Sequence, residues 1–319
     1  MRRAMTLGLV AIGLVFISLP ASPASESADA AVEKTITVDG LRREYLLVVP
    51  KEAKGPMPVV FMLHGGGGNA RGAERFSHFS PLAQKEGFVV VYPQGVEGHW
   101  NDGRGVEIMR AQRENIDDVK FVRAVLADVA ASHDIDRGRV FATGVSNGGI
   151  MAHRLAAEAS DAMAAIAPVV GGMAPSIAEK FKPQQAVSIL IIQGESDPIV
   201  PLAGGDVSFA GGPSRGKLLA TKDTLAKYLE RNGSHGDPVT TTIDQGSRNS
   251  VEMEKYPDGP DGVKTYFYLV KNGGHTWFGA ASERATAARG RGNPDFRATA
   301  AVWDFFKSCP PRTPVATGK

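Results

Sequence analysis

The 319-residue sequence contains a single cysteine, Cys309, so no disulfide can form within the chain. Neither sign of charge dominates, because 36 Lys and Arg residues balance 34 Asp and Glu residues. No basic stretch carries interleaved aromatic side chains, so the composition offers nucleic acid no electrostatic reason to bind. With 43% hydrophobic residues the chain is long enough to build a substantial core, and Cys309 is expected to be inert.

The N-terminus carries an apolar run, residues 7–19, that is too short to cross a bilayer, which takes roughly 20 residues. Arg2 and Arg3 precede the run and small residues follow it, a pattern typical of a cleaved export signal. We therefore predict a signal peptide over residues 1–24, although cleavage after residue 30 fits the pattern equally well. The mature protein is predicted to be secreted, extracellular or periplasmic, and free of the membrane.

Beyond this segment, short continuous apolar runs alternate with helical patterns, which indicates an α/β fold. An antiparallel pair of strands is expected first, with a turn at Asp39-Gly40. Strands are predicted at residues 35–38, 44–49, 59–63, 88–92, 140–142, 189–192 and 265–270, and helices at residues 117–133, 149–159, 217–231 and 294–309. The prediction is a mostly parallel central sheet with helices on both faces. It forms one catalytic domain over residues 31–309, followed by a flexible tail at 310–319.

A serine between glycines lies where a predicted strand turns into a predicted helix. The segment Gly144-Val145-Ser146-Asn147-Gly148 follows the strand that ends near Thr143. A serine at such a turn has an unfavourable backbone conformation and a hydroxyl that faces solvent, and only small neighbours let the strand and helix approach closely. The pattern predicts that Ser146 is a nucleophile, with a plain glycine-rich turn as the alternative.

A serine hydroxyl needs a base to take its proton and a carboxylate to orient that base. At such a strand-to-helix turn the chain order is Ser, then Asp or Glu, then His. His275 directly follows the last predicted strand on a glycine loop and is the predicted base, whereas His235 follows a helix and is the alternative. Asp197 follows a buried strand and is the predicted acid, with Glu195 and Asp206 as alternatives.

A run of glycines follows another predicted strand, in His64-Gly65-Gly66-Gly67-Gly68-Asn69. Residues without side chains expose backbone N–H groups, which can point at the negative oxygen of a tetrahedral intermediate. We predict one such oxyanion donor at Gly66, with Gly65 and Gly67 as alternatives, and a second at Asn147. The run lacks the endings and spacings of phosphate-binding loops, so phosphate binding is the weaker interpretation.

Together these segments resemble the polyhydroxybutyrate depolymerase and feruloyl esterase family of α/β-hydrolases. The resemblance spans residues ~40 to ~308. It rests on the glycine run, Trp100-Asn101-Asp102, Gly144-Val145-Ser146-Asn147-Gly148-Gly149, Gly194-Glu195-Ser196-Asp197 and Gly274-His275-Thr276-Trp277. It implies an α/β-hydrolase fold and a carboxylic ester hydrolase that needs no metal or organic cofactor. It also implies that Ser146, Asp197 and His275 form the catalytic triad.

The resemblance implies a small-molecule or polymer ester as substrate: short-acyl, acetyl or feruloyl esters, or hydroxybutyrate oligomers. Trp100 and Trp277 are candidate walls of the substrate pocket, with packing under their own loops as the alternative. We see neither the disulfides nor the adsorption module of many polymer-degrading members, and therefore expect soluble esters to be better substrates than solid polyester. A serine peptidase or amidase on the same fold is one alternative function, and a non-catalytic binding protein is another.

Overall fold

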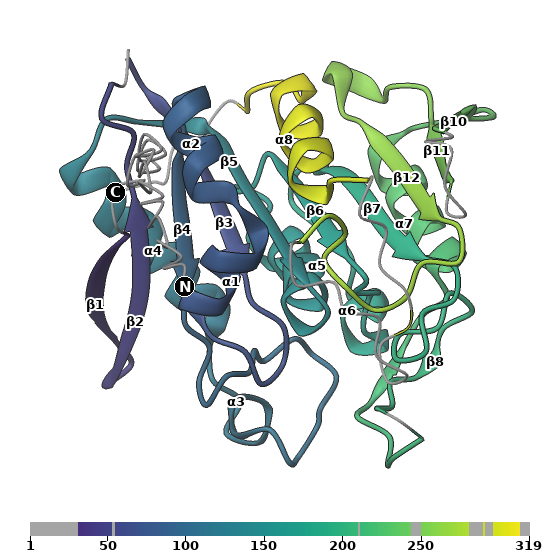
Figure 1. The fold of residues 1–319 in the computed structure, drawn as a ribbon, viewed down its shortest axis with the longest axis horizontal. Helices are drawn as coiled ribbons and strands as arrows, with labels where there is room; N and C mark the ends of the chain where they lie inside the picture. The colour runs from purple at the N-terminus through teal and green to yellow at the C-terminus, as the bar shows by residue number, and fades with distance from the viewer. Residues whose placement is uncertain are drawn as a thin grey trace, which may run out of the picture.

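A ten-stranded sheet runs through the molecule in the computed structural model, in the order β1-β2-β4-β3-β5-β6-β7-β12-β11-β10 (Figure 1). The structure describes residues 31–52, 55–209, 211–243, 250–280, 290 and 296–312. The predicted signal peptide, residues 1–24, lies outside these residues. Within the described ranges, no helix is both long enough and apolar enough to span a membrane.

The centre of the sheet is parallel, as the apolar runs predicted. In spatial order, its strands are β4 (Val89–Pro93), β3 (Met57–Leu63), β5 (Ile135–Val145), β6 (Ala165–Val169), β7 (Ser188–Gly194) and β12 (Thr265–Val270). The apolar runs did not predict β6, because its five residues include two alanines and a proline, which are poor strand formers. The prediction of a mostly parallel sheet is otherwise confirmed.

Antiparallel strands flank the parallel region on both sides. The predicted hairpin is β1 (Val32–Val38) and β2 (Leu41–Val48), and its turn residues Asp39 and Gly40 have φ of 49° and 78°, as tight hairpin turns require. On the other side, β11 (Val251–Lys255) and β10 (Val239–Ile243) extend the sheet from β12. A separate pair, β8 (Gly205–Asp206) and β9 (Lys217–Leu218), was also not predicted.

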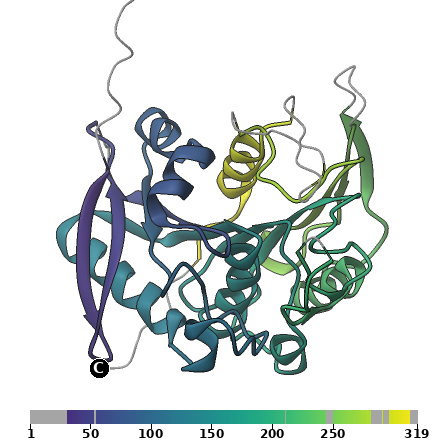
Figure 2. The same ribbon diagram turned by 60° about the horizontal axis from the view of Figure 1, so that its bottom comes forward.

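Helices cover both faces of the sheet (Figure 2). On one face lie α1 (Ala70–Ser77), α2 (Phe79–Glu86) and α8 (Ala298–Ser308); on the other lie α4 (Asp118–Ser132), α5 (Asn147–Glu158) and α7 (Thr221–Asn232). The short helices α3 (Arg110–Arg113) and α6 (Pro175–Glu179) lie in connecting segments. The sequence predicted α4, α5, α7 and α8 and missed α1, α2, α3 and α6. The helix predicted over residues 217–231 begins only at Thr221, because residues 217 and 218 pair with β8 as strand β9.

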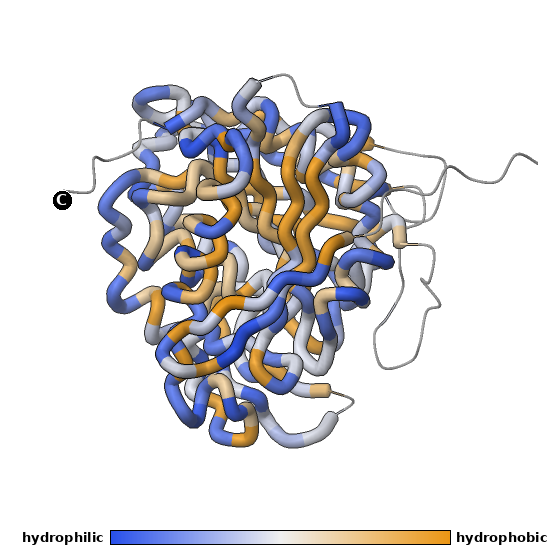
Figure 3. Tube along the Cα trace, turned by 90° about the vertical axis from the view of Figure 1, so that its left-hand side faces the viewer, coloured by the Kyte–Doolittle hydropathy of each residue, from blue (hydrophilic) through white to orange (hydrophobic). Residues whose placement is uncertain are grey.

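The alternation of side chains along β3 divides the core between the two faces. Val59 and Phe61 belong to the cluster that packs against α4 and α5, whereas Val60 and Met62 belong to the cluster that packs against α1, α2 and α8. Figure 3 shows the apolar strands as an orange band within largely hydrophilic surroundings. Because both faces are covered, β3 is buried at every position rather than at alternate ones.

The C-terminal end of the domain is attached to the core. Cys309 directly follows α8 and is buried. Burial raises the pKa of its thiol to about 12, so the thiol stays protonated and unreactive. Of the tail predicted as flexible, residues 310–312 are described, and the Arg312 N–H donates to the Gly138 carbonyl at 2.8 Å. Residues 313–319 lie outside the described residues.

A buried ion pair connects the hairpin to the helical layer. Arg43 of β2 is 4% exposed, and its Nη2 lies 2.7 Å from Oδ1 of Asp118, at the start of α4. Its guanidinium also lies 3.9 Å from the centre of the Phe121 ring. The other carboxylate oxygen of Asp118 accepts a hydrogen bond from the Asn101 N–H at 2.7 Å. The pair therefore fixes the loop after β4 as well as the hairpin.

We predict that Arg43→Met lowers the free energy of unfolding by about 3–5 kcal/mol, because it leaves the Asp118 carboxylate buried without a cation. The matched control is Arg42→Met, since the Arg42 side chain is 71% exposed in its pair with Glu44 and should contribute little. Urea unfolding of both variants measures the difference. Equal stability of the two variants would contradict the role given to the buried pair.

Candidate active site

The predicted site residues follow parallel strands whose carboxyl ends meet at one edge of the sheet. Ser146 follows β5, Asp197 follows β7, His275 follows β12, and the glycine run follows β3. The registers of β3 with β5 and of β7 with β12 bring these strand ends level. This edge is where open α/β sheets bind ligands.

Ser146 occupies the sharp turn between β5 and α5 that the sequence predicted. Its φ of 55° and ψ of −121° lie in a region that non-glycine residues rarely adopt. Two hydrogen bonds hold the strained residue, from the Ser146 N–H to the Val169 carbonyl at 3.0 Å and from the Ile150 N–H to the Ser146 carbonyl at 2.8 Å. The surrounding structure therefore imposes the conformation that presents the hydroxyl to the pocket.

Glycines on either side of Ser146 let the strand and the helix meet. A Cβ added at Gly144 would lie 2.6 Å from the carbonyl carbon of Gly148, and one added at Gly148 would lie 2.4 Å from the Leu63 oxygen. No real Cβ contact is that short, so a side chain at either position would push the elements apart. This confirms the prediction that only residues as small as glycine at both positions let the strand and the helix approach closely.

Asp197 and His275 form a buried pair at the rim of the pocket. Oδ2 of Asp197 lies 2.8 Å from Nδ1 of His275, and the two side chains are 0% and 9% exposed. The other carboxylate oxygen accepts hydrogen bonds from the N–H groups of Ile199 at 2.8 Å and Val200 at 2.9 Å. These bonds orient the carboxylate toward the ring and leave Nε2 of His275 available to a reacting group.

The alternatives for the acid and the base are engaged elsewhere. Glu195 accepts hydrogen bonds from the Asn272 N–H at 3.0 Å and the Lys271 ammonium at 2.9 Å, and these two donors lower the pKa of its carboxyl. Asp206, on the exposed β8, accepts a hydrogen bond from the Ser214 hydroxyl at 2.6 Å. His235 is exposed after the end of α7. The structure thus brings Asp197, and not these residues, against His275.

Two backbone N–H groups are available at the predicted oxyanion positions. Gly66 and Asn147 line the same pocket as the candidate nucleophile and base, and neither N–H donates to an acceptor in the described part of the chain. Asn147 is the first residue of α5, where helix N–H groups lack intrahelical acceptors and favour negative charge. The alternative Gly67 is occupied, because its N–H donates to the Gly98 carbonyl at 2.9 Å; Gly65 also lines the pocket.

His64 anchors the start of the glycine run. It is 1% exposed, and burial lowers the pKa of its ring to about 4, so the ring is neutral. Its Nδ1 then donates to the Gly65 carbonyl at 2.8 Å, while Nε2 accepts from the Gly95 N–H at 3.0 Å. The histidine of the motif is therefore a positioning group for the loop and is not a proton-transfer group.

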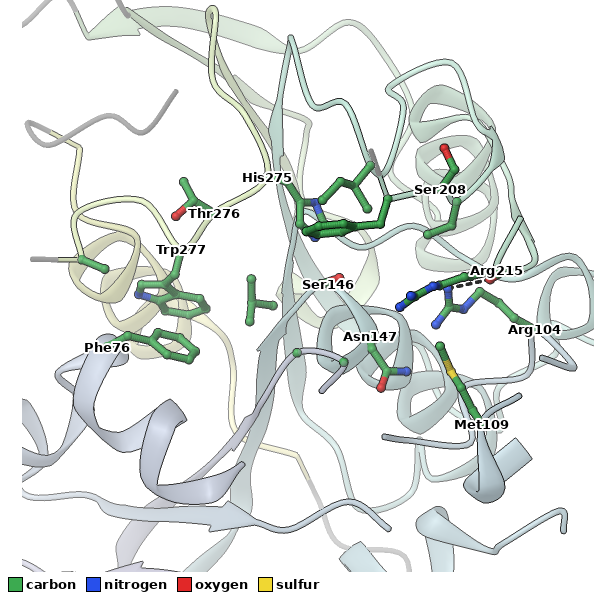
Figure 4. Close-up of a pocket in the computed structure, with 17 residues that line it drawn as sticks. Phe76, Arg104, Met109, Ser146, Asn147, Ser208, Arg215, His275, Thr276 and Trp277 are labelled. Carbon is green, nitrogen blue, oxygen red and sulfur yellow. Dashed lines mark hydrogen bonds between the residues drawn. The ribbon is translucent and has the colours of Figure 1, made fainter. Parts of the chain in front are cut away.

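The two tryptophans predicted to wall the pocket lie in different places. Trp277 lines the pocket beside Phe76, with the two ring centres 6.0 Å apart (Figure 4). Trp100 is 0% exposed and does not line the pocket, and its indole N–H donates to the His64 carbonyl at 2.9 Å. The prediction for Trp100 is wrong because its indole N–H finds its acceptor inside the core.

The pocket has two chemically different sides (Figure 4). Phe76 and Trp277 lie on one side of Ser146, and Arg104 and Arg215 lie on the other. His275 lies near Ser146, although among the described residues no hydrogen bond joins the two; such bonds are often long in free enzymes. The described residues contain no cluster of three or more His, Cys, Asp or Glu side chains that could hold a metal ion.

A buried polar network behind the pocket was missed by the sequence analysis. Asp102 is fully buried and bonds the side chains of Asn147, Arg104 and Gln112. The signal in the sequence was the segment Trp100-Asn101-Asp102, whose polar residues follow an apolar strand. That segment does not reveal which groups the carboxylate contacts, because its partners lie elsewhere in the chain.

Comparison with known proteins assigns the chain to a family. Residues 44–206 match the model of the Dienelactone hydrolase family. The chain is also 30% identical over 276 residues to the esterase candidate NocK of Nocardia uniformis subsp. tsuyamanensis, a match that covers 83% of this chain and 78% of that protein. This chain belongs to the dienelactone hydrolase family.

Further relatives of this family member are named as esterases. It is 27% identical over 224 residues to Feruloyl esterase B of Piromyces equi, over 68% of this chain and 39% of that enzyme. The solved acetyl xylan esterase from Aspergillus awamori superposes with a TM-score of 0.57 at 17% identity, over 77% of this chain and 94% of that one. The latter likeness shows the fold. The predicted α/β-hydrolase fold and the predicted carboxylic ester hydrolase are confirmed.

We predict that Gly148→Ala destabilises this dienelactone hydrolase family member by about 1–3 kcal/mol in urea unfolding, because the new methyl group would overlap the Leu63 oxygen. The sign of the change in the free energy of unfolding is informative, since without a clash alanine would stabilise a helix over glycine by about 1 kcal/mol. Gly172→Ala is the control, because its Cβ would meet its nearest neighbours at an ordinary 3.5 Å. A stabilised Gly148→Ala variant would contradict the close approach of α5 to the end of β3.

Proposed function

We propose that this protein is a secreted serine esterase that works through an acyl-enzyme, with Ser146 as nucleophile, His275 as base and Asp197 as orienting acid. The observation that carries the proposal is their convergence at one pocket. The strained serine, the buried His–Asp pair at 2.8 Å and the free N–H groups of Gly66 and Asn147 come from four separate strand ends. Each is a part that acyl transfer requires.

In the first half of the reaction, Nε2 of His275 takes the proton of the Ser146 hydroxyl as Oγ attacks the ester carbonyl carbon. The carbonyl oxygen becomes negative and accepts hydrogen bonds from the Gly66 and Asn147 N–H groups. The bond to the alcohol then breaks, and the alcohol leaves with the proton held by His275. An acyl group remains on Ser146.

Water completes the cycle. His275 takes a proton from a water molecule, whose oxygen attacks the acyl carbonyl carbon and forms a second oxyanion at the same donors. The bond to Ser146 breaks, the proton returns to Oγ, and the carboxylic acid is released. Asp197 holds the Nδ1–H of the ring throughout and stabilises the imidazolium that forms at each step, without taking the proton itself.

For the substrate, we propose soluble short-acyl, acetyl or feruloyl esters. The feruloyl esterase relative and the aromatic side of the pocket, with Phe76 and Trp277, support an aryl or acyl group placed next to Ser146. Hydroxybutyrate oligomers are the other substrate that the sequence resemblance suggests. Secretion rests on the N-terminal pattern of residues 1–24.

We predict that Ser146→Ala lowers the hydrolysis of methyl ferulate and p-nitrophenyl acetate by about 10⁴-fold or more and abolishes covalent labelling by an organophosphonate probe. The urea unfolding midpoint should not fall, because the side chain is small and faces the pocket. Labelling that persists in Ser146→Ala would show that another residue is the nucleophile.

We predict that Asp197→Asn lowers kcat by about 10³- to 10⁴-fold, because the amide would stabilise the wrong tautomer of His275. Glu195→Gln is the matched control, since Glu195 is only two residues away but bonds Lys271 and Asn272. It should keep kcat within about twofold. The reverse ranking of the two variants in steady-state assays would assign the acid to Glu195.

A further inference from the structure

The side chain of Asn147 is held apart from the reacting groups that its backbone faces. Its backbone N–H is the proposed oxyanion donor, whereas its side-chain amide points away from Ser146 (Figure 4), and the residue as a whole is 2% exposed. Ser146, the residue that caps α5, makes no side-chain capping bond. The first turn of this helix therefore gains no stabilisation from a side-chain cap.

Three hydrogen bonds hold the Asn147 amide. Oδ1 accepts from the Trp100 N–H at 2.9 Å, and Nδ2 donates to Oδ2 of Asp102 at 2.5 Å and to the Trp100 carbonyl at 3.3 Å. A reversed amide would face a donor with a donor and an acceptor with an acceptor, so only this orientation satisfies both partners. The amide is clamped on both sides.

Asp102 is the fixed end of this clamp. Its side chain is 0% exposed, and Oδ2 lies 2.8 Å from Nη2 of Arg104, which is itself 3% exposed. Oδ1 accepts from Nε2 of Gln112 at 3.0 Å. Arg104 in turn donates to the carbonyl of Arg215, its neighbour on the same side of the pocket, at 2.9 Å. A charged, fully bonded carboxylate at this depth resists movement, because any displacement leaves charge buried without partners.

The position of an oxyanion donor affects the rate of the chemical step far more than it affects the affinity for the substrate. The donor must lie about 2.7–3.1 Å from the oxygen of the tetrahedral intermediate, which is displaced from the carbonyl oxygen of the bound ester. A displacement of about 1 Å can reduce the rate 100-fold. The clamp acts on the one residue of α5 whose N–H must meet this requirement.

We infer that Asp102 is a positioning residue for ester hydrolysis, which acts through the Asn147 amide to hold the Asn147 N–H at the oxyanion. Asp102 does not contact the substrate, because its carboxylate is fully buried behind the pocket. The inference rests on the proposed function, since it requires an oxyanion next to Ser146. It adds a residue to the machinery that neither the triad nor the glycine run contains.

The test compares Asp102→Asn with Asp161→Asn. Both replace a carboxylate that is paired with an arginine, but only Asp102 bonds Asn147. In Asp102→Asn one carboxylate oxygen is replaced by an NH2 group, which cannot accept the hydrogen bonds that this oxygen accepts. We expect kcat on methyl ferulate to fall about 10- to 100-fold with KM within about threefold. Asp161→Asn should keep kcat, because Asp161 follows α5 and pairs with Arg123 of α4 rather than with the loop after β4.

Asn147→Ala gives a second measurement that does not remove a buried charge. This variant keeps the backbone N–H and the helix but removes the side-chain amide that Trp100 and Asp102 hold. Its kcat should fall by a factor similar to that of Asp102→Asn. In the double variant with Asp102→Asn the losses should not multiply, because both changes remove one interaction. Two outcomes would overturn this inference and leave the proposed function standing. One is a loss of kcat in the double variant equal to the product of the two single losses, and the other is full kcat in Asp102→Asn while Ser146→Ala is inactive. Wild-type activity that survives Ser146→Ala would instead refute the proposed function.

Discussion

The close approach of β5 and α5 determines the rest of the candidate site. Neither Gly144 nor Gly148 has room for a Cβ, because the added atom would collide with backbone atoms of neighbouring elements. The absence of side chains at both positions lets the chain turn sharply at Ser146. The turn leaves Ser146 with a φ of 55°, a strain that its backbone hydrogen bonds to neighbouring elements offset. It also places the N–H of Asn147, the first residue of α5, at the same pocket as Ser146. One steric constraint thus positions both the proposed nucleophile and one proposed oxyanion donor.

Buried carboxylates organise the surroundings of this turn. Asp197, Asp102 and Asp118 have side chains that are 0% exposed, and each is paired with a nearly buried basic residue, as His275, Arg104 and Arg43 respectively. A carboxylate removed from water is stable only with such partners, so each pair has little freedom to rearrange. In the proposed mechanism the first two pairs orient the base and one oxyanion donor, and the third holds the loop after β4. Exposed pairs such as Arg42 with Glu44 have no comparable effect.

Much of the fold could be predicted from local patterns. Strands buried on both faces are continuous apolar runs, and β3, β4 and β7 were predicted for that reason. β6 was missed because its burial comes from neighbouring strands rather than from strand-forming residues. Trp100 and Trp277 both stand in segments of polar and glycine residues, and their sequences do not distinguish a ring that lines a pocket from one that lies beneath it. That distinction depends on where the indole N–H finds its acceptor, which is the His64 carbonyl for Trp100 and the Thr299 hydroxyl for Trp277.

The sequence by itself determined the turn at Ser146, because the constraint is local: a strand, a serine between glycines and a helix within about ten residues. It also determined the order of the triad candidates along the chain. Only the tertiary structure decided which carboxylate meets His275, since Asp197 and Glu195 share one loop and the contact joins residues 78 positions apart. The same holds for the contact of Asp102 with Asn147, 45 positions apart. Such contacts arise from strand register and helix packing, which no local pattern of residues records.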